Sequence, residues 1–325
     1  RGRGDVYKRQ TFYSSRKYLA ATRHFNSLKV DDYVVRKESN EHRKIDAEAN
    51  WLRSVPPDLQ PFTARLIEGG SARTPGQYAT MYSSFPTVAE LYLAQSSRFV
   101  WLKVLGSCIG FLNRAYRHTA EDQTSSFSWL VIDKLKSRIE RYPDFLPSSD
   151  DQLTINGTNV GSLSSIVDRL EETVREAPAL TPCIMHGDFC FSNMLFDPRS
   201  DRIVLIDPRG LIADQMTIYG DIRYDIAKLG HSIIGRYDQI VGGPLVADCN
   251  GHGKYSLIVP KDPLRGWLEE QFLSASVDSV FFNDSAVHAA IVSLFLAMIP
   301  LHSDDPRRQR TLFANGLRLF DAYFS

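Results

Sequence analysis

Two short polar segments near the middle of the chain constrain its fold and chemistry most. The first begins at His186 and reads HGDFCFSN, and the second begins at Ile206 and reads IDPRG. Together they contribute Asp188, Asn193 and Asp207. Carboxylate and amide oxygens of this kind hold Mg²⁺, and a carboxylate can also orient a hydroxyl group and take its proton. The pattern therefore predicts a centre for phosphoryl transfer.

The spacing of these residues resembles that of protein kinases, in which Asn follows the catalytic Asp by five positions and a metal-binding Asp ends the next hairpin. Asn193 lies five positions after Asp188, and a strand predicted over residues 202–206 leads to Asp207. His-Gly-Asp and Ile-Asp, in place of His-Arg-Asp and Asp-Phe-Gly, resemble the aminoglycoside phosphotransferase and choline kinase-like family. This resemblance implies an α+β, bilobal protein-kinase-like fold with a small β-rich amino-terminal lobe and a larger, mostly helical carboxyl-terminal lobe.

The matched offsets favour catalytic roles over ordinary loop capping, which is the more common use of a lone Asp. We expect Asp188 to orient and deprotonate an acceptor, and Asn193 and Asp207 to hold the metal, with ATP and Mg²⁺ as cofactors. His186 is expected to pack and hydrogen-bond beneath the loop. Arg209 has two alternatives, contact with an anionic phosphate or substrate and pairing with a nearby carboxylate.

The amino-terminal part is expected to supply a lysine for the phosphates. Residues 33–37 read as a strand, and Lys37 is preferred to Arg36 because it shares a face with the apolar Val35. A helix beginning near Glu41 offers Glu48 as the partner of the lysine, with Glu41 itself as the competing candidate. The apolar stripe of this helix consists of Ile45, Ala49 and Leu52.

No glycine-rich phosphate loop precedes this strand, so Ser14 and Ser15 are the small hydroxyl residues expected to cover the phosphates. Residues 1–10 are interpreted as a non-native or disordered tail. Residues 11–85 are assigned to a nucleotide-binding lobe and residues 86–325 to a catalytic and substrate lobe.

Two helices further along the chain complete the prediction. Asp221 is a plausible N-cap for a helix with Ile222, Ile226, Leu229 and Ile233 on one face. By the family resemblance, Asp225 would accept hydrogen bonds from the catalytic loop. The apolar run of residues 289–300 is shorter than a bilayer crossing and is interpreted as a buried helix.

Composition indicates an ordinary globular protein. The chain has 325 residues with 38 basic and 38 acidic side chains, so no basic excess indicates nucleic acid or an anionic membrane surface. Four cysteines form no CxxC pair, which favours a reducing cytoplasm. We expect no nucleic-acid partner and no membrane insertion, and the oligomeric state and the choice between ATP and GTP stay open.

The acceptor is less well defined, because this fold serves many substrates. A sugar or polysaccharide precursor is the first hypothesis, through a resemblance to family members associated with capsule assembly; aminosugars, aminoglycosides and choline-like alcohols are the others. Four aromatic residues could cage a quaternary amine or simply belong to the core, namely Tyr219, Tyr224, Tyr237 and Trp267. The rival hypotheses are a nucleotide-binding pseudokinase and a metal-dependent hydrolase with His186, Asp188 and Asp207 as ligands.

Overall fold

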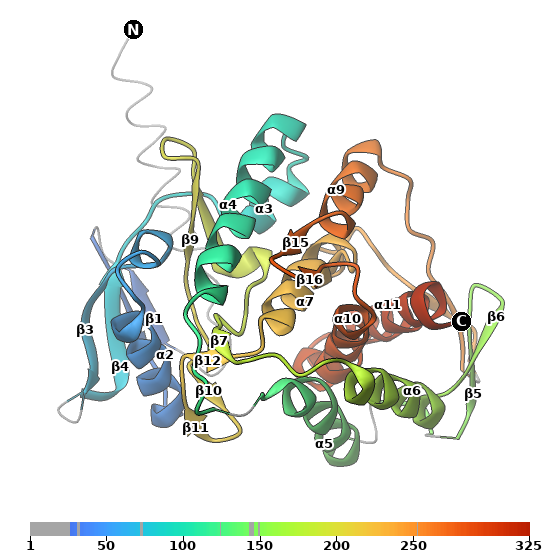
Figure 1. Cartoon of the computed structure of the whole chain (residues 1–325). Helices are drawn as coiled ribbons and strands as arrows, with labels where there is room; N and C mark the ends of the chain where they lie inside the picture. Colours follow the sequence, from blue (N-terminus) through green and yellow to red (C-terminus); the bar gives the residue numbers. More distant parts are fainter. Residues whose placement is uncertain are drawn as a thin grey trace, which may run out of the picture.

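The computed structural model describes residues 27–30, 33–71, 74–123, 125–142, 146–148, 150–251 and 253–325. Two predictions, the tail of residues 1–10 and the phosphate-covering role of Ser14 and Ser15, lie outside these ranges. Over the described residues the chain has the α+β, kinase-like architecture that was predicted, with a small sheet on one side and a larger helical lobe on the other (Figure 1).

The smaller lobe is built on a four-stranded antiparallel sheet with the strand order β1-β2-β4-β3. Its strands are β1 (Ser27–Val30), β2 (Val34–Glu38), β3 (Leu66–Ser71) and β4 (Thr74–Met81). Helix α2 (His42–Ser54) packs against β3 and β4 and lies beside the sheet in Figure 1. The strand predicted over residues 33–37 is β2, displaced by one residue.

Helix α2 buries the stripe expected from the sequence. Ile45, Ala49 and Leu52 are all buried, because residues three and four apart lie on one helical face. Trp51 is buried as well, and its indole donates a hydrogen bond of 2.8 Å to the carbonyl of Met185 in the larger lobe. Helix α2 is therefore attached both to the sheet and to the segment that precedes the catalytic loop.

The larger lobe is mostly helical, as predicted. Its helices are α3 (Val88–Leu93), α4 (Arg98–Tyr116), α5 (Lys134–Arg141), α6 (Leu163–Glu176), α7 (Ile222–Ile233), α8 (Tyr237–Val241), α9 (Pro263–Leu273), α10 (Ser285–Met298) and α11 (Pro306–Phe324). A π-helical turn, η2 (Trp129–Asp133), leads into α5, and the 3-10 turns are η1 (Gln60–Phe62), η4 (Phe191–Asn193) and η5 (Ile299–His302). Apolar residues at helical spacing predict helices from Thr87 to Leu93, Phe99 to His118 and Phe127 to Tyr142, and α3, α4 and the η2–α5 segment confirm them to within a few residues.

Short strands make up the rest of the lobe and frame the catalytic loop. They are β5 (Gln152–Ile155), β6 (Thr158–Ser162), β7 (Cys183–Ile184), β8 (Met194–Asp197), β9 (Arg202–Leu205), β10 (Leu211–Ile212), β11 (Gln215–Met216), β12 (Tyr219–Gly220), β13 (Asp248–Cys249), β14 (Lys254–Ser256), β15 (Ser276–Val277) and β16 (Val280–Phe281). Strand β7 pairs with β12 and β8 pairs with β9. Residues 186–193 lie between β7 and β8, and Asp207 lies just after β9.

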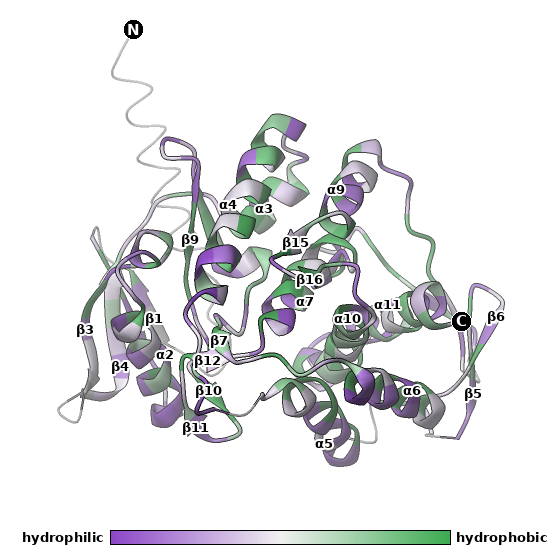
Figure 2. Cartoon of the chain, in the orientation of Figure 1, coloured by the Kyte–Doolittle hydropathy of each residue, from purple (hydrophilic) through white to green (hydrophobic). Residues whose placement is uncertain are grey.

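Helices α7 and α10 form the centre of the larger lobe. The Asp221 side chain caps α7 by accepting from the backbone N–H of Arg223 at 3.0 Å, as the sequence predicted. The four residues expected on one apolar face, Ile222, Ile226, Leu229 and Ile233, are all buried, and so is every other residue of α7. Figure 2 shows hydrophobic residues gathered around α7 and α10, whereas α5 and α6 carry hydrophilic ones.

The apolar helix near the carboxyl terminus is part of this core. Residues 285–302 form one segment long and apolar enough to cross a membrane by length and composition, but 83% of that segment is buried inside the protein. Helix α10 contacts α5, α6, α7 and α11, and its Ser293 hydroxyl donates to the Val131 carbonyl. The prediction of a buried core helix is confirmed.

Candidate active site

Asp188 lies at the centre of a compact polar arrangement in the larger lobe. The side chain of Asn193 donates through Nδ2 to Oδ2 of Asp188 at 2.7 Å and to its backbone carbonyl at 3.1 Å. The ammonium of Lys228, on α7, lies 2.8 Å from Oδ1 of Asp188. The loop is thus closed on itself by Asn193 and attached to the core by Lys228.

The charge of Asp188 is stabilised by its neighbours. Burial alone raises the pKa of this carboxyl, but the nearby cations Lys228 and Arg209 outweigh burial and hold the pKa well below its usual range. Conversely, burial lowers the pKa of Lys228 and the Asp188 charge raises it above its ordinary value. Asp188 is therefore ionised at neutral pH and ready to accept a hydrogen bond from a hydroxyl group.

Asp225 holds the backbone that precedes Asp188. Its two carboxylate oxygens accept hydrogen bonds from the backbone N–H groups of His186, at 2.6 Å, and Gly187, at 2.7 Å. Burial raises the pKa of Asp225 to about 7 against the opposing effect of these two bonds. The contacts match the role that the family resemblance implied, since Asp225 contacts the loop backbone and shapes it.

His186 has the surroundings of a scaffold residue. It is fully buried, its Nε2 donates to the carbonyl of Ile206 at 3.1 Å, and its Nδ1 accepts from the backbone N–H of Asp188 at 3.3 Å. Burial lowers the pKa of the imidazole to about 4, so it is neutral at physiological pH. Both ring nitrogens are used within the protein, which leaves no lone pair for a metal.

The second half of the site lies on the small sheet and on α2. The ammonium of Lys37 is 2.6 Å from Oε2 of Glu48 and 3.1 Å from Oδ1 of Asp207. Burial lowers the pKa of Lys37, but the two carboxylates raise it overall, while burial raises the pKa of Glu48 to about 7. The structure thus brings together the three residues predicted to act on the nucleotide and metal.

The competing candidates are directed elsewhere. Arg36 points to the opposite face of β2 and forms an exposed ion pair with Glu68. Glu41 lies 3.5 Å from Lys44, and both side chains are half-exposed. Lys37 and Glu48 are therefore the pair whose geometry suits the site.

Asp207 occupies an unusual backbone conformation. Its φ is +54°, a region in which Asp is tolerated better than most residues and which recurs at functional sites. Its side chain is 46% exposed, which suits a group that must also meet a ligand. Just beyond it, Gly210 has φ +60°, and an added Cβ would lie only 2.1 Å from the Ala47 carbonyl of α2. Glycine therefore lets the Asp207 loop dock on the helix that carries Glu48.

The two halves are joined by backbone hydrogen bonds. The N–H of Ile206 donates to the carbonyl of Asn193 at 3.0 Å, and the N–H of Arg209 donates to the carbonyl of His186 at 2.8 Å. The Arg209 Nε also donates to the Gly187 carbonyl at 3.1 Å. Asp188 and Asp207 are consequently held on adjacent, mutually bonded segments.

The donor set fits Mg²⁺ bound together with phosphates. Among the described residues no group of three or more His, Cys, Asp or Glu is arranged to hold a metal. Mg²⁺ in phosphoryl transfer is typically bound by one or two protein oxygens and completed by phosphate oxygens and water. The partly exposed carboxylate of Asp207 and the amide oxygen of Asn193 meet that requirement, and both lie on the segments joined above.

Two residues at the site were not predicted. Tyr78, on β4, donates its hydroxyl to Glu48 at 3.0 Å and lies 3.4 Å from Oδ1 of Asp207. No side chain of this strand was predicted to lie at the site. Lys228 lies three residues after Asp225, so helical periodicity could have placed it near the catalytic loop.

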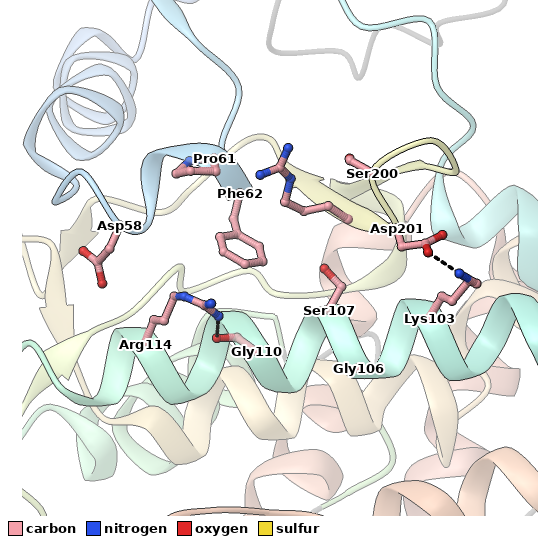
Figure 3. Close-up of a pocket in the computed structure, with 11 residues that line it drawn as sticks. Asp58, Pro61, Phe62, Lys103, Gly106, Ser107, Gly110, Arg114, Ser200 and Asp201 are labelled. Carbon is pink, nitrogen blue, oxygen red and sulfur yellow. Dashed lines mark hydrogen bonds and ion pairs between the residues drawn. The ribbon is translucent and has the colours of Figure 1, made fainter.

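A separate hollow of about 430 Å³ lies away from these residues. Figure 3 shows one face of α4, with Lys103, Ser107 and Arg114, opposite Phe62 and the β8–β9 turn. Lys103 pairs with Asp201 of that turn, and the Arg114 guanidinium lies 5.2 Å from the centre of the Phe62 ring. None of the residues that line this hollow belongs to the catalytic set. The active site is therefore identified from its side-chain chemistry and not from the presence of this hollow.

The part of the chain that contains this site is similar to a known protein family. Residues 110–251, which include the whole catalytic loop and the Asp207 segment, match the model of the phosphotransferase enzyme family. No curated protein sequence matches the chain significantly.

Solved structures share the fold at low sequence identity. Aminoglycoside phosphotransferase APH(4)-Ia, as a thermostable mutant with AMP-PNP and hygromycin B, superposes with a TM-score of 0.55 at 11% identity over 92% of each chain. The gentamicin complex of APH(2")-IIa gives a TM-score of 0.51 at 12% identity, over 95% of this chain and 94% of the other. Choline kinase LicA from Streptococcus pneumoniae gives a TM-score of 0.48 at 11% identity, over 98% of this chain and 100% of the other, and this score is too low to support an argument.

Fold and site together define a kinase that acts on small molecules. Residues 110–251, the segment that carries Asp188, Asn193 and Asp207, are similar to the phosphotransferase enzyme family.

Proposed function

We propose that the chain transfers the γ-phosphoryl group of ATP, bound with Mg²⁺, to a hydroxyl group of a small molecule. The observation that carries the proposal is the pair of joined clusters, Lys37–Glu48–Asp207 and Asp188–Asn193–Lys228. The first cluster suits a nucleotide tail and its cation, and the second suits an acceptor hydroxyl. ATP use is also supported by AMP-PNP in the complex of the similar APH(4)-Ia.

Asp188 would orient the acceptor and take its proton. Its low pKa makes it a weak base, so its main contribution is to hold the hydroxyl in line with the phosphate and to receive the proton late in the reaction. Asn193 fixes the carboxylate and leaves its own Oδ1 for the cation. When bound, Mg²⁺ would neutralise charge on the transferred phosphate.

Lys37 would contact the phosphates. Its ammonium is desolvated and oriented by Glu48, and Tyr78 holds the same carboxylate. Because these groups are already ordered, little conformational entropy would be lost when the nucleotide binds. The Asp207 carboxylate, now 3.1 Å from Lys37, would turn to share the incoming cation.

The acceptor classes stay those of the sequence hypotheses: a sugar or polysaccharide precursor, an aminosugar or aminoglycoside, or a choline-like alcohol. The aromatic residues considered as an amine cage do not converge. Arg209 lies 5.7 Å from the Tyr224 ring centre, and Trp267 is covered by Arg98 at 5.4 Å. Tyr237 instead packs on His231, with ring centres 4.4 Å apart. A sugar acceptor is therefore preferred to a quaternary amine.

The rival functions are less well supported. A pseudokinase would be expected to have lost a base or metal residue, whereas this chain keeps Asp188, Asn193 and Asp207. A hydrolase using His186 as a metal ligand conflicts with the buried imidazole, whose nitrogens contact Ile206 and Asp188.

The test is acceptor-dependent formation of ADP from Mg-ATP by purified protein, over a panel of sugars, aminosugars, choline and aminoglycosides. The proposal expects ADP to form only when a suitable hydroxyl compound is present, with phosphate recovered on that compound. Equal phosphate release without any acceptor would indicate hydrolysis. Tight nucleotide binding without turnover on every acceptor would indicate a pseudokinase.

A further inference from the structure

A group of basic side chains surrounds Tyr224 beside the catalytic Asp188. The ammonium of Lys134 donates to the Tyr224 hydroxyl at 3.1 Å and lies 5.7 Å from the ring centre. The guanidinium of Arg209 lies 5.7 Å from the same ring centre. Lys228 is one helical turn after Tyr224 and contacts Asp188. One fully buried tyrosine is thus flanked by cations that lie close to the reacting position.

The negative charges nearby do not balance these cations. Asp188 is already paired with Lys228, and Asp225 is used by the loop backbone. Within the described ranges neither Lys134, Arg138 nor Arg209 has a carboxylate partner. Arg138 instead donates to the Ala297 carbonyl at 2.6 Å. The local excess is therefore positive, although the chain as a whole is neutral.

Placing these cations together costs energy. Burial lowers the pKa of Lys134 well below its ordinary value, and the charges of Arg209, Arg138 and Lys228 lower it further. Burial also lowers the pKa of Arg138, with Arg209 adding to the effect. An anion bound among these side chains would offset the repulsion through charge-assisted hydrogen bonds.

The position of these cations indicates that the anion belongs to the acceptor and not to the nucleotide. Lys134 and Arg138 lie on α5 and Tyr224 on α7, both in the larger lobe and away from strands β1–β4 (Figure 1). The nucleotide end has its own lysine, whose charge is met by Glu48 and Asp207. Lys228, one helical turn from Tyr224, contacts Asp188, where the acceptor hydroxyl is expected.

We infer that the acceptor carries a carboxylate or phosphate group, which Lys134 and Arg209 bind beside Tyr224 while its hydroxyl meets Asp188. The inference rests on the proposed function and narrows its substrate class to anionic hydroxyl compounds. It excludes aminoglycosides, because a polycation would meet Lys134, Arg138 and Arg209 with like charge.

The experiment uses four probes that share one ring and differ in charge: glucose, glucosamine, glucuronate and glucose 6-phosphate. Each is tested as an acceptor with Mg-ATP and, separately, as a ligand by calorimetry. The variants are Lys134→Met and, as the matched control, Lys136→Met on the same helix, whose lysine pairs with Glu171 at 2.7 Å. Lys134→Arg tests recovery of the charge.

The expected result is a preference for glucuronate or glucose 6-phosphate, and the better of the two distinguishes a carboxylate site from a phosphate site. Lys134→Met should raise the acceptor KM about 10- to 100-fold with kcat and the nucleotide KM little changed, as loss of a charge-assisted contact predicts. Lys136→Met should behave like the unaltered protein, and Lys134→Arg should recover part of the affinity.

The outcomes separate this inference from the proposed function. Turnover of glucose or glucosamine that Lys134→Met leaves unchanged would overturn the inference and leave the kinase assignment standing. A raised nucleotide KM in Lys134→Met, or no binding of either anionic probe, would also overturn it. Binding of an anionic probe that is lost in Lys134→Met, without any turnover, would support the anion site and count against the kinase function.

Discussion

At the scale of single residues, neighbouring positions on β2 have opposite surroundings. Lys37 is buried between Glu48 and Asp207, whereas Arg36 is exposed and pairs with Glu68. Alternation of side chains along a strand causes this difference. Two substitutions that each remove one positive charge therefore provide a controlled comparison.

Lys37→Met should lower kcat/KM for Mg-ATP by about 100-fold, the size found when one preorganised donor to a developing charge is removed. Arg36→Met should change it less than about threefold, because surface ion pairs contribute little. Steady-state kinetics with nucleotide as the varied substrate would measure both. Equal losses in the two variants would contradict the assignment of Lys37.

The buried imidazole of His186 predicts a dependence of stability on pH. Its pKa falls from 6.5 to about 4 on folding, so between these values the unfolded chain binds the additional proton. Stability should therefore rise with pH through this window and be lost as pH falls from 6.5 towards 4. His186 should contribute about 2 kcal/mol to the difference between pH 5 and pH 7.

Urea unfolding of the unaltered protein and of His186→Asn at both pH values would measure this contribution. Burial also lowers the pKa of His288 to about 4, but this residue is present in both proteins, so its contribution to the pH dependence of stability cancels when the two are compared. An identical pH dependence in the two proteins would show that His186 is not a buried neutral group.

At the scale of elements, the docking of the Asp207 loop on α2 depends on Gly210. Gly210→Ala should destabilise the protein by about 3 kcal/mol or more, since it adds backbone strain at φ +60° and a Cβ against the Ala47 carbonyl. Gly157→Ala is the control, because Gly157 has φ +89° but its Cβ would meet nothing within 4 Å. It should cost about 1 kcal/mol, from strain alone.

Thermal unfolding and kcat would be compared for these two variants. Only Gly210→Ala should lose activity. Helix α2 carries Glu48, so a shift of the helix would disturb the ion pair between Glu48 and Lys37. If both variants were equally stable and active, the contact between the loop and the helix would not matter for the site.

Elements with strong periodicity were predictable from the sequence, and residues that act through tertiary contacts were not. The stripe of α2 and the Asp284 cap of α10 follow from local rules, and both are present. The burial of all of α7 could not be foreseen, because it depends on packing against α8, α9 and α10, which the local pattern of α7 does not encode. Tyr78 was missed for the same reason, since only strand pairing brings it to Glu48.

At the scale of the whole molecule, the site divides by charge. At the end on the small sheet, Lys37 lies with two carboxylates, and this end would bind the nucleotide with its cation. The end near α5 carries basic side chains and would bind an anionic group of the acceptor. The sequence contained every one of these residues, but Lys134 and Arg209 are far apart along the chain. Their meeting at Tyr224 depends on how α5 and α7 both pack against α10.

The central claim is that both ends serve one transfer reaction, with Asp188 acting on the acceptor and Asp207 on the metal-bound nucleotide. The most direct measurement is Mg-ATP binding by calorimetry together with ³¹P NMR of transfer, in the unaltered protein, Asp188→Asn and Asp207→Asn. Asn at position 188 keeps an oxygen for Lys228, which limits unfolding. We predict that both variants lose transfer, that Asp188→Asn still binds Mg-ATP normally, and that Asp207→Asn loses the Mg²⁺ dependence of binding. Strong transfer by Asp188→Asn, or unchanged Mg²⁺-dependent binding by Asp207→Asn, would contradict the account.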